Sequence, residues 1–318
     1  MNPSGMQRTI VAIKKYTRDW RWNRIAYLLI LPALIGTAIV HILPMISSIL
    51  ISFRDLDIFS LQQWTKAPFI GLRNFIDGFN PVTTIGQRYW RSVLNVLIYG
   101  AVTIPVGYVI GLGVALLLNK KFVGRTLVRG IVLLPYILPD SVTYNVWRFM
   151  FQSRIGIVNK TLLALGLIQE PLVWLVGKYS MIAVIVASIW KGWPFGCLLL
   201  LAGLQTIPQE VIEAATIDGA GPWQRFRYVI FPYLKPVTKT LLLLNVIWNF
   251  NAFNQFFIML GSDPGIQTDV PSVLIHRETF QNFHFGLGSA MSLILVILMM
   301  IVAAVYLRTL RVNKSMEE

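Results

Sequence analysis

The chain has 318 residues, of which 55% are hydrophobic and only 13% charged, and its net charge is +14 at pH 7. This ratio excludes an ordinary soluble domain and is typical of a polytopic membrane protein. We interpret the positive charge as basic loops that stay in the cytoplasm, and not as a nucleic-acid-binding surface. Cys197 is the only cysteine, which excludes an intramolecular disulfide and a cysteine-cluster metal site.

Six segments are apolar enough to cross a membrane, which takes about 20 mostly apolar residues per helix. They cover residues 25–53, 93–119, 130–151, 179–207, 237–261 and 285–307. Residues 130–147 of the third span hold only one charged residue, Asp140, and residues 179–207 hold only Lys191. The sequence therefore predicts an all-α polytopic membrane protein with a transmembrane domain over 25–307, an N-terminal arm over 1–24 and a tail over 308–318.

Basic residues near the span ends predict the orientation, because Lys and Arg concentrate in cytoplasmic loops. The arm 1–24 has six basic residues and one acidic residue, and the short connection after the second span contains Lys120, Lys121, Arg125 and Arg129. With six spans, both termini and the polar segment 208–236 lie on this side, so we expect them in the cytoplasm. The first outer loop is also basic, although Asp55, Asp57 and Asp77 offset its charge.

The polar segment 208–236 between the fourth and fifth spans is more ordered than a simple connection requires. Pro208 favours the first turn of a helix, and Gly219 is a natural helix stop because glycine tolerates the left-handed conformation. Gly221 and Pro222 then predict a turn, and a second short helix is expected over 223–229, returning to the membrane at Pro232. An ordinary interfacial helix–turn–helix is the alternative interpretation.

The motifs of several enzyme classes are missing. The sequence contains no glycine-rich phosphate loop, no His-Glu-x-x-His and no nucleophile elbow. His41, His276 and His284 lack the spacing of metal ligands. We therefore expect a chain that is not itself an enzyme and that holds no cofactor and no metal of its own.

The segment Glu213-Ala214-Ala215, with Gly219, Val229, Phe231 and Pro232 in register, resembles the cytoplasmic coupling loop of permease subunits of binding-protein-dependent ABC importers. The resemblance extends over the spans: 69–75, 122–125, 134–139, 190–195 and 249–253 match elements of the sugar-importing branch. The nearest pattern is the maltose/maltodextrin permease type, the first of two unlike permease subunits. The resemblance implies a location in the bacterial plasma (inner) membrane.

The resemblance also implies partners. These are a second permease subunit, two ATP-binding cassette ATPase subunits that bind ATP and Mg, an extracytoplasmic sugar-binding protein, and membrane lipid. The residues it assigns to ATPase coupling are Glu213, Ala214, Ala215, Asp218 and Gly219.

A sugar pocket inside this one subunit is a further implication of the resemblance. Carried over position by position, its residues are Tyr136, Asp140, Gly192, Phe195, Asn245 and Asn249, and we add Tyr144, Lys191 and Trp248 as candidates. Carboxylates and amides hydrogen-bond to sugar hydroxyls, and aromatic faces cover the C–H side of a sugar ring.

Three positions depart from the relative: Asp140 and Asn245 replace hydroxyl residues, and Lys191 replaces an apolar residue. The cargo therefore need not be maltose. Three alternatives stay open for the pocket: Asp140 and Lys191 form a buried structural ion pair, the asparagines hydrogen-bond between helices, and Tyr144 and Trp248 serve packing.

The predicted function is the permease subunit of an ATP-driven importer of a sugar, an oligosaccharide or a related polyol. One alternative is an ATP-independent secondary transporter that uses Asp140 as its coupling site, although it leaves the Glu213 segment unexplained. Another is an importer of the same class with a different cargo, such as a phosphate-bearing polyol.

Overall fold

The computed structural model describes residue 24 and residues 27–314, with side chains as far as residue 308. All of the predicted arm except residue 24, and the last four residues of the predicted tail, lie outside the described residues. Within the described part, every regular element is a helix, and the only β-pairing is one bridge between Arg54 and Phe69. The predicted all-α class is confirmed.

Five described helices are long and apolar enough to cross a membrane: Tyr27–Ile51, Thr84–Asn119, Gly177–Gln205, Pro222–Phe250 and Phe285–Arg308. A sixth candidate is a bent pair of helices, Arg125–Ile137 and Asp140–Met150. These elements correspond in order to the six predicted segments, with different bounds at several ends.

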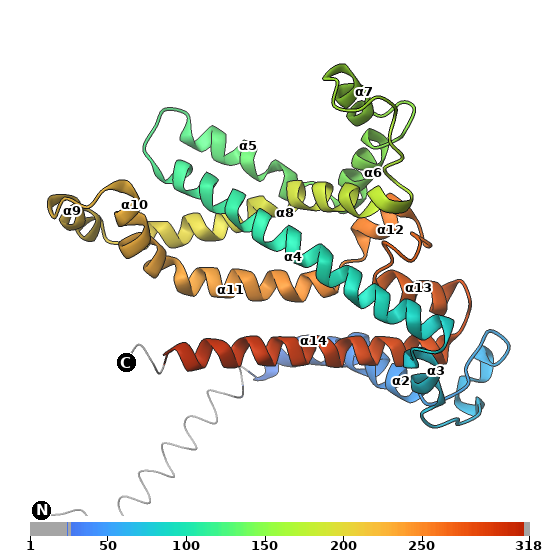
Figure 1. Ribbon diagram of the computed structural model, residues 1–318. Helices are drawn as coiled ribbons and strands as arrows, with labels where there is room; N and C mark the ends of the chain where they lie inside the picture. Colours follow the sequence, from blue (N-terminus) through green and yellow to red (C-terminus); the bar gives the residue numbers. More distant parts are fainter. Residues whose placement is uncertain (1–23, 25–26, 315–318) are drawn as a thin grey trace, which may run out of the picture.

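The long helices form a bundle in which α4 (Thr84–Asn119), α8 (Ser180–Gln205) and α11 (Phe231–Phe250) pack against one another (Figure 1). A second group, α2 (Leu43–Ile51) and α14 (Phe285–Lys314), packs together beside it. The short helices α9 (Gln209–Ile217) and α10 (Pro222–Arg225), the α4–α5 connection and the C-terminal end of α14 lie at one end of the bundle (Figure 1). We call this the α9 end.

The third predicted span, 130–151, is not one helix. Helix α5 (Arg125–Ile137) and helix α6 (Asp140–Met150) meet at an angle of 86°. The break falls at Leu138 and Pro139, which both have extended backbone conformations. Proline disfavours helical geometry in the residue before it and has no N–H to continue the ladder, so Pro139 ends α5 and starts α6.

The fifth predicted span, 237–261, begins earlier and ends earlier than expected. Helix α10 runs through a π-helical turn, Phe226–Ile230, directly into α11, which ends at Phe250. Helix α12 (Asn254–Leu260) is separate from α11. This π-helical turn lies just before Pro232. Its wider geometry leaves room for the proline ring, which in a regular α-helix would clash with a carbonyl of the preceding turn. The expected return at Pro232 is therefore a continuous helix of 29 residues, Pro222–Phe250.

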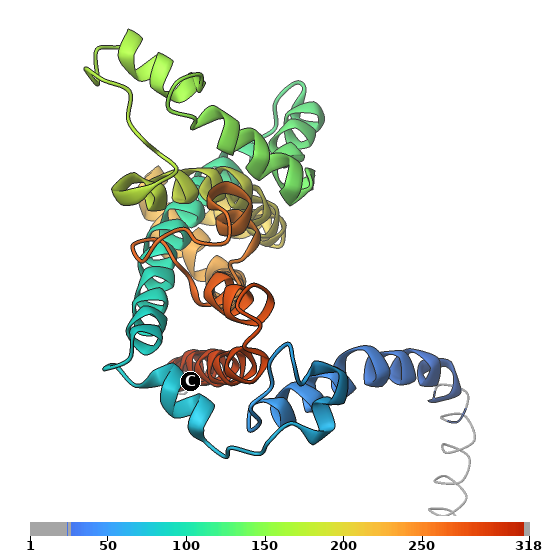
Figure 2. The ribbon, with the colours of Figure 1, turned by 90° about the vertical axis from the view of Figure 1, so that its right-hand side faces the viewer.

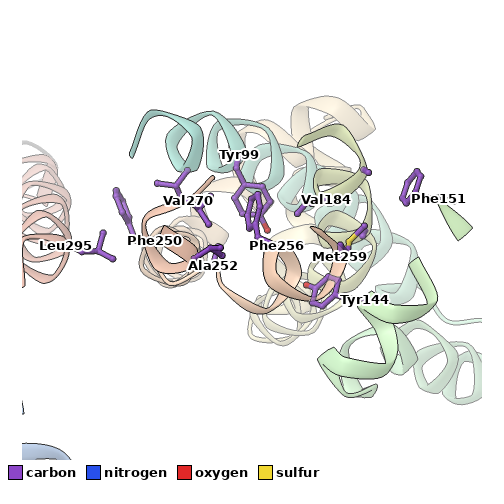
Figure 3. Packing of buried hydrophobic residues seen from close by; sticks show 14 residues of the cluster. Tyr99, Tyr144, Phe151, Val184, Phe250, Ala252, Phe256, Met259, Val270 and Leu295 are labelled. Carbon is purple, nitrogen blue, oxygen red and sulfur yellow. The ribbon is translucent and has the colours of Figure 1, made fainter. Parts of the chain in front are cut away.

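The buried core near the other end of the bundle draws residues from α4, α6, α8, α11, α12 and α14 (Figure 3). Tyr99 of α4 meets Phe256 of α12 edge to face, with ring centroids 5.1 Å apart. Val184, Phe250 and Met259 belong to the same buried cluster. This packing holds α12 in place although α12 is too short to be stable alone.

Charged residues hold the loop after α12 against α4. Helix α4 begins at Thr84, nine residues before the predicted span, and these extra turns carry Arg88. Its Nε donates to Asp269 Oδ2 at 2.6 Å, and Asp269 is fully buried. Arg277 of α13 (Pro271–Phe280) pairs with the same carboxylate at 3.1 Å. One basic residue of the first outer loop is thus accounted for by a structural ion pair.

Helix α7 (Ile157–Ala164) lies away from the two groups of long helices (Figure 2). Asn159 anchors the return of the chain: its Nδ2 donates to the Leu172 carbonyl at 2.9 Å, and its Oδ1 accepts from Trp174 Nε1 at 2.7 Å. One buried amide thus connects α7 to the returning chain at 172–174. The 151–177 segment is therefore ordered by its own contacts.

Candidate functional site

A cavity of about 470 Å³ lies among α4, α5, α6, α8, α11 and α12. All nine residues predicted to bind cargo line it: Tyr136, Asp140, Tyr144, Lys191, Gly192, Phe195, Asn245, Trp248 and Asn249. The structure thus brings together side chains that lie more than 110 positions apart in the sequence, as the resemblance implied. Their role toward a cargo stays a prediction.

The breaks in the helices form one side of the cavity. Tyr136 precedes the α5–α6 break and Asp140 follows it, while residues 251–253 come from the interruption between α11 and α12 and residues 254–255 from the start of α12. A break frees backbone carbonyls and turns side chains away from the helix course. Ser272 Oγ donates to the free Ala252 carbonyl at 2.6 Å, which fixes the second break.

Lys191 and Asp140 form an ion pair, with Lys191 Nζ 3.1 Å from Asp140 Oδ1. Lys191 Nζ also donates to the Leu138 carbonyl at 2.6 Å, at the end of α5. The second oxygen, Asp140 Oδ2, accepts from Asn254 Nδ2 at 2.8 Å. The pair that the sequence left open is therefore present, and it ties α8 to the break in the third span and to the start of α12.

Three aromatic rings form an apolar wall. The Tyr136 and Phe195 ring centroids lie 5.3 Å apart, and those of Phe195 and Trp248 lie 5.1 Å apart. Tyr136 and Trp248 are both exposed. Exposed aromatic faces of this kind can cover the C–H face of a ring compound.

Gly192 keeps the cavity open. A Cβ placed there would meet no atom within 4 Å. Gly100 differs, because a Cβ there would overlap the Asn249 amide, so α4 and α11 approach closely at that point. The absence of a side chain at Gly192 thus leaves cavity space open, whereas at Gly100 it lets α4 and α11 pack closely.

The predicted polar residues differ in their contacts. Asn249 is only 8% exposed, and its Nδ2 donates to the Val96 carbonyl of α4 at 2.8 Å, which is the interhelical bond considered from the sequence. Its buried Oδ1 has no hydrogen-bond partner among the described residues. Asn245 is half-buried and donates to the Leu241 carbonyl of its own helix at 2.9 Å. Tyr144 is buried in the core cluster, so packing accounts for most of its surface.

Further lining residues were not predicted from the sequence. The polar ones are Tyr99, Thr103, Tyr108, Ser188, Asn251, Asn254 and Gln255. Gln255 Nε2 donates to the Tyr99 hydroxyl at 3.1 Å, which joins α12 to α4. The sequence signal for Asn254 and Gln255 is the cluster of polar residues at 249–255, of which only Asn249 was predicted to bind cargo.

The coupling segment, 208–236, has the turn chemistry that the sequence indicates. Gly219 has φ +79°, and Ala220 N donates to Ala215 O at 3.0 Å while Gly219 N donates to Thr216 O at 3.1 Å. These two bonds form a Schellman motif, which ends α9 and satisfies its last carbonyls. Arg225 of α10 donates to Thr216 Oγ1 at 2.8 Å and so fixes α10 against α9.

The predicted coupling residues lie on the surface of this segment, except one. Glu213, Ala214, Asp218 and Gly219 are exposed, while Ala215 is half-buried. Ile217, Trp223 and Tyr228 add large exposed apolar side chains to the same segment. On the other side, Ile212 and Ile230 pack on the buried cluster at the ends of α4 and α8. The segment is therefore seated on the bundle and presents its remaining surface outward.

Comparison with known proteins agrees with the family resemblance of the sequence. Residues 107–312 match the family model of binding-protein-dependent transport system inner membrane components. The trehalose/maltose transport system permease protein MalF of Thermococcus litoralis is 34% identical over 93% of this chain and 97% of its own length. The sulfoquinovosyl glycerol transport system permease protein SmoG of Agrobacterium fabrum is 33% identical over 96% of this chain and 98% of its own length.

A solved structure shares the fold. A chain of a bacterial ABC transporter involved in the import of the acidic polysaccharide alginate superposes with a TM-score of 0.77 at 22% identity, covering 94% of this chain and 98% of its own. With the family model covering most of the chain and relatives aligned over nearly its whole length, this chain belongs to the family of binding-protein-dependent transport system inner membrane components.

Proposed function

We propose that this chain is the permease subunit of an ATP-driven importer that translocates a sugar, an oligosaccharide or related polyol, delivered by an extracytoplasmic binding protein. The observation that carries the proposal is the convergence of all nine predicted residues on one cavity with an aromatic wall and hydrogen-bonding groups. Relatives named for trehalose/maltose and for sulfoquinovosyl glycerol support a carbohydrate cargo.

The mechanism follows from two sites far apart in one bundle. The aromatic wall takes the C–H face of a sugar ring, and Asp140 and Asn245 exchange hydrogen bonds with its hydroxyls. The residues of the coupling segment contact the partner ATPase subunits, which hydrolyse ATP. Movement of α9 and α10 passes into α11, which lines the cavity. Transport then depends on the free energy that couples nucleotide binding on the partner subunits to cargo binding in this chain.

The proposed topology places the α9 end in the cytoplasm, with both termini on that side of the bacterial inner membrane. A second permease subunit completes the path. The location of the coupling segment at the same end as the C-terminal end of α14 supports this arrangement (Figure 1). The basic α4–α5 connection, which carries Lys120 and Lys121, is there too.

The test of the function is ATPase activity of the reconstituted complex, with the binding protein loaded in turn with a panel of sugars. We expect one class of sugars to stimulate hydrolysis and to be taken up. Uptake by this chain alone in liposomes, driven by an ion gradient and without ATP, would instead establish the secondary transporter.

The test of the coupling assignment is a crosslink from α9. A cysteine at the exposed position Ala214, in a Cys197→Ser background, should form a crosslink to an ATPase subunit. Exposed Val123, in the α4–α5 connection, provides a comparison position at the same end of the bundle. If Ala214→Cys never reaches an ATPase subunit while Val123→Cys does, the contact is assigned to the wrong loop.

A further inference from the structure

The cavity lining contains one anion and one cation among the described residues, Asp140 and Lys191. They pair with each other at 3.1 Å, so the lining carries no net charge. The sequence shows that these two charges occur in the apolar runs of two different spans. Within a membrane, either charge alone would be costly, so each stabilises the other.

The Lys191 ammonium has no free donor to offer a cargo. An ammonium group has three N–H donors. Its Nζ lies 2.6 Å from the Leu138 carbonyl, 3.1 Å from Asp140 Oδ1 and 3.5 Å from the Pro135 carbonyl. The side chain is only 12% exposed. Lys191 lines the cavity, but these three oxygens take its donors, so it supports the break in the third span and neutralises Asp140 instead of binding an anionic cargo.

Asp140 is the more accessible member of the pair, with 41% of its side chain exposed. Oδ1 accepts from Lys191 and Oδ2 from Asn254, and a carboxylate has about four acceptor positions in all. Acceptor capacity therefore remains for hydroxyl donors that enter the cavity. An acidic group at the same place would meet a carboxylate at close range with no free cation to compensate it.

From this geometry we propose that the cargo is an uncharged carbohydrate, and that the Asp140–Lys191 pair excludes acidic sugars from the cavity. This inference rests on the proposed function and adds the charge of the cargo to it. Asp140 is the specificity-determining residue, because it both accepts hydroxyls and repels carboxylates, sulfonates and phosphates. Lys191 is a positioning residue, because it acts through Asp140 and the α5–α6 break.

The experiment is equilibrium binding to the purified complex in lipid nanodiscs, without the binding protein, so that only the permease selects the cargo. The probes are neutral di- and trisaccharides, among them trehalose and maltotriose. Each is paired with the same sugar in which glucuronic acid replaces one glucose. The proteins are the wild type, Asp140→Asn, and the double variant Asp140→Asn, Lys191→Met. Size-exclusion behaviour and basal ATPase rate establish that each complex is assembled.

We expect the wild type to prefer the neutral member of a pair by at least about tenfold, because like charges at close range are strongly unfavourable. Asp140→Asn leaves Lys191 uncompensated, so this preference should fall or reverse in favour of the uronic acid. The double variant removes both charges, so its preference should lie between those of the wild type and of Asp140→Asn. A purely structural ion pair would change the affinity for both members of a pair equally.

Three results would overturn the inference, each in a different way. A wild type that binds the uronic acid as well as the neutral sugar shows that the cargo charge is wrong. An unchanged preference for the neutral sugar in Asp140→Asn shows that the Asp140–Lys191 ion pair does not determine this preference. Failure of every carbohydrate of either charge to bind, in an assembled complex, contradicts the proposed function itself.

Discussion

The coupling segment and the cavity are built in opposite ways. The coupling segment takes its shape from neighbours in sequence: Gly219, Ala220 and the carbonyls of Ala215 and Thr216 lie within six residues and close one capping motif. The cavity takes its shape from six helices, and residues as far apart as Tyr99 and Gln255 touch across it. The first region is formed by local contacts, while the second depends on contacts between residues far apart in the sequence.

This difference predicts different responses to mutation. In the coupling segment a single backbone conformation carries the geometry, so one glycine should matter far more than its neighbours. In the cavity, the geometry is shared by many contacts, so a substitution should act through the volume it fills or the bond it removes. Four pairs of variants test this contrast.

The largest effect is expected at Gly219. Its φ of +79° is strained for a β-branched residue, at a cost of about 1–2 kcal/mol or more, so Gly219→Val should break the Schellman motif. Sugar-stimulated ATPase activity and uptake should fall by more than about tenfold while membrane insertion is unchanged, because about 1.4 kcal/mol corresponds to a factor of ten. The measurements are uptake and ATPase activity in proteoliposomes.

The control is Gly221→Ala in the same segment. Gly221 has φ −66°, and a Cβ there would lie 3.6 Å from Gln224, an ordinary contact. We expect this variant to transport like the wild type. Equal losses of transport in the two variants would show that the segment is sensitive to any added side chain, which would contradict the role of the left-handed conformation at Gly219.

The next effect is expected at Gly192. Gly192→Leu starts from a Cβ with no atom within 4 Å and adds bulk to the cavity, so it should weaken apparent sugar binding by about 1–3 kcal/mol, the range for overpacking a defined site. The thermal unfolding temperature should stay the same or rise. Binding to nanodisc complexes and a thermal melt measure the two quantities.

Its matched control is Gly113→Leu in α4. Gly113 is also a helical glycine with no atom within 4 Å of a Cβ, and it lies outside the cavity lining. Binding should be unchanged. Wild-type affinity in Gly192→Leu would mean that the cargo does not use this part of the cavity.

A smaller effect separates two asparagines of the cavity. Asn249→Ala removes the buried interhelical hydrogen bond to the Val96 carbonyl, so it should destabilise the complex by about 0.5–1.5 kcal/mol, the net contribution of one hydrogen bond. Asn245→Ala removes only a bond within α11, so we expect near-normal stability and weaker binding by about 0.5–1.5 kcal/mol.

Thermal melts and binding isotherms on the same preparations separate these two outcomes. If both variants lose stability equally, Asn245 has a packing role. If neither loses affinity for sugar, the amides do not face the cargo, and the aromatic wall with Asp140 accounts for recognition.

The smallest effect is expected at Thr216. Its Oγ1 accepts an exposed hydrogen bond from Arg225, so Thr216→Val should reduce coupling by only about 0.5 kcal/mol, roughly twofold in stimulated ATPase activity. Thr216→Ser keeps the bond and serves as the control. A loss as large as that of Gly219→Val would show that the α9–α10 contact, and not the cap, holds the segment.

The sequence predicted those features that depend on local chemistry. Gly219 permits the left-handed conformation that ends α9. Four cargo residues, Tyr136, Gly192, Phe195 and Asn249, could be carried over because each lies in a matching motif. The 86° break in the third span had a signal at Leu138 and Pro139, but the apolar run continues through it and hides the bend. The α11–α12 break contains no proline, and it depends on packing of Phe256 and on the Ser272 bond, which appear only in three dimensions.

Tyr99 and Gln255 could not be assigned to the cavity from the sequence for a related reason. A tyrosine in an apolar helix is usually a packing residue, and only the approach of α12 to α4 brings its hydroxyl to the cavity. Asn249 shows the same point atom by atom: its Nδ2 donates to the Val96 carbonyl, whereas its Oδ1 has no hydrogen-bond partner among the described residues. Motifs identified the positions, while helix packing decides which atoms remain free.

The continuous helix Pro222–Phe250 can act as a lever between the two ends of the bundle. Its 29 residues at about 1.5 Å per residue extend roughly 43 Å, from the exposed surface at the α9 end to the cavity wall. A rigid tilt of about 5° about one end would displace the other by almost 4 Å, on the order of the contact distance between a sugar and an aromatic ring. The π-helical turn beside Pro232 keeps this lever in one piece at the position where a proline would otherwise have divided it.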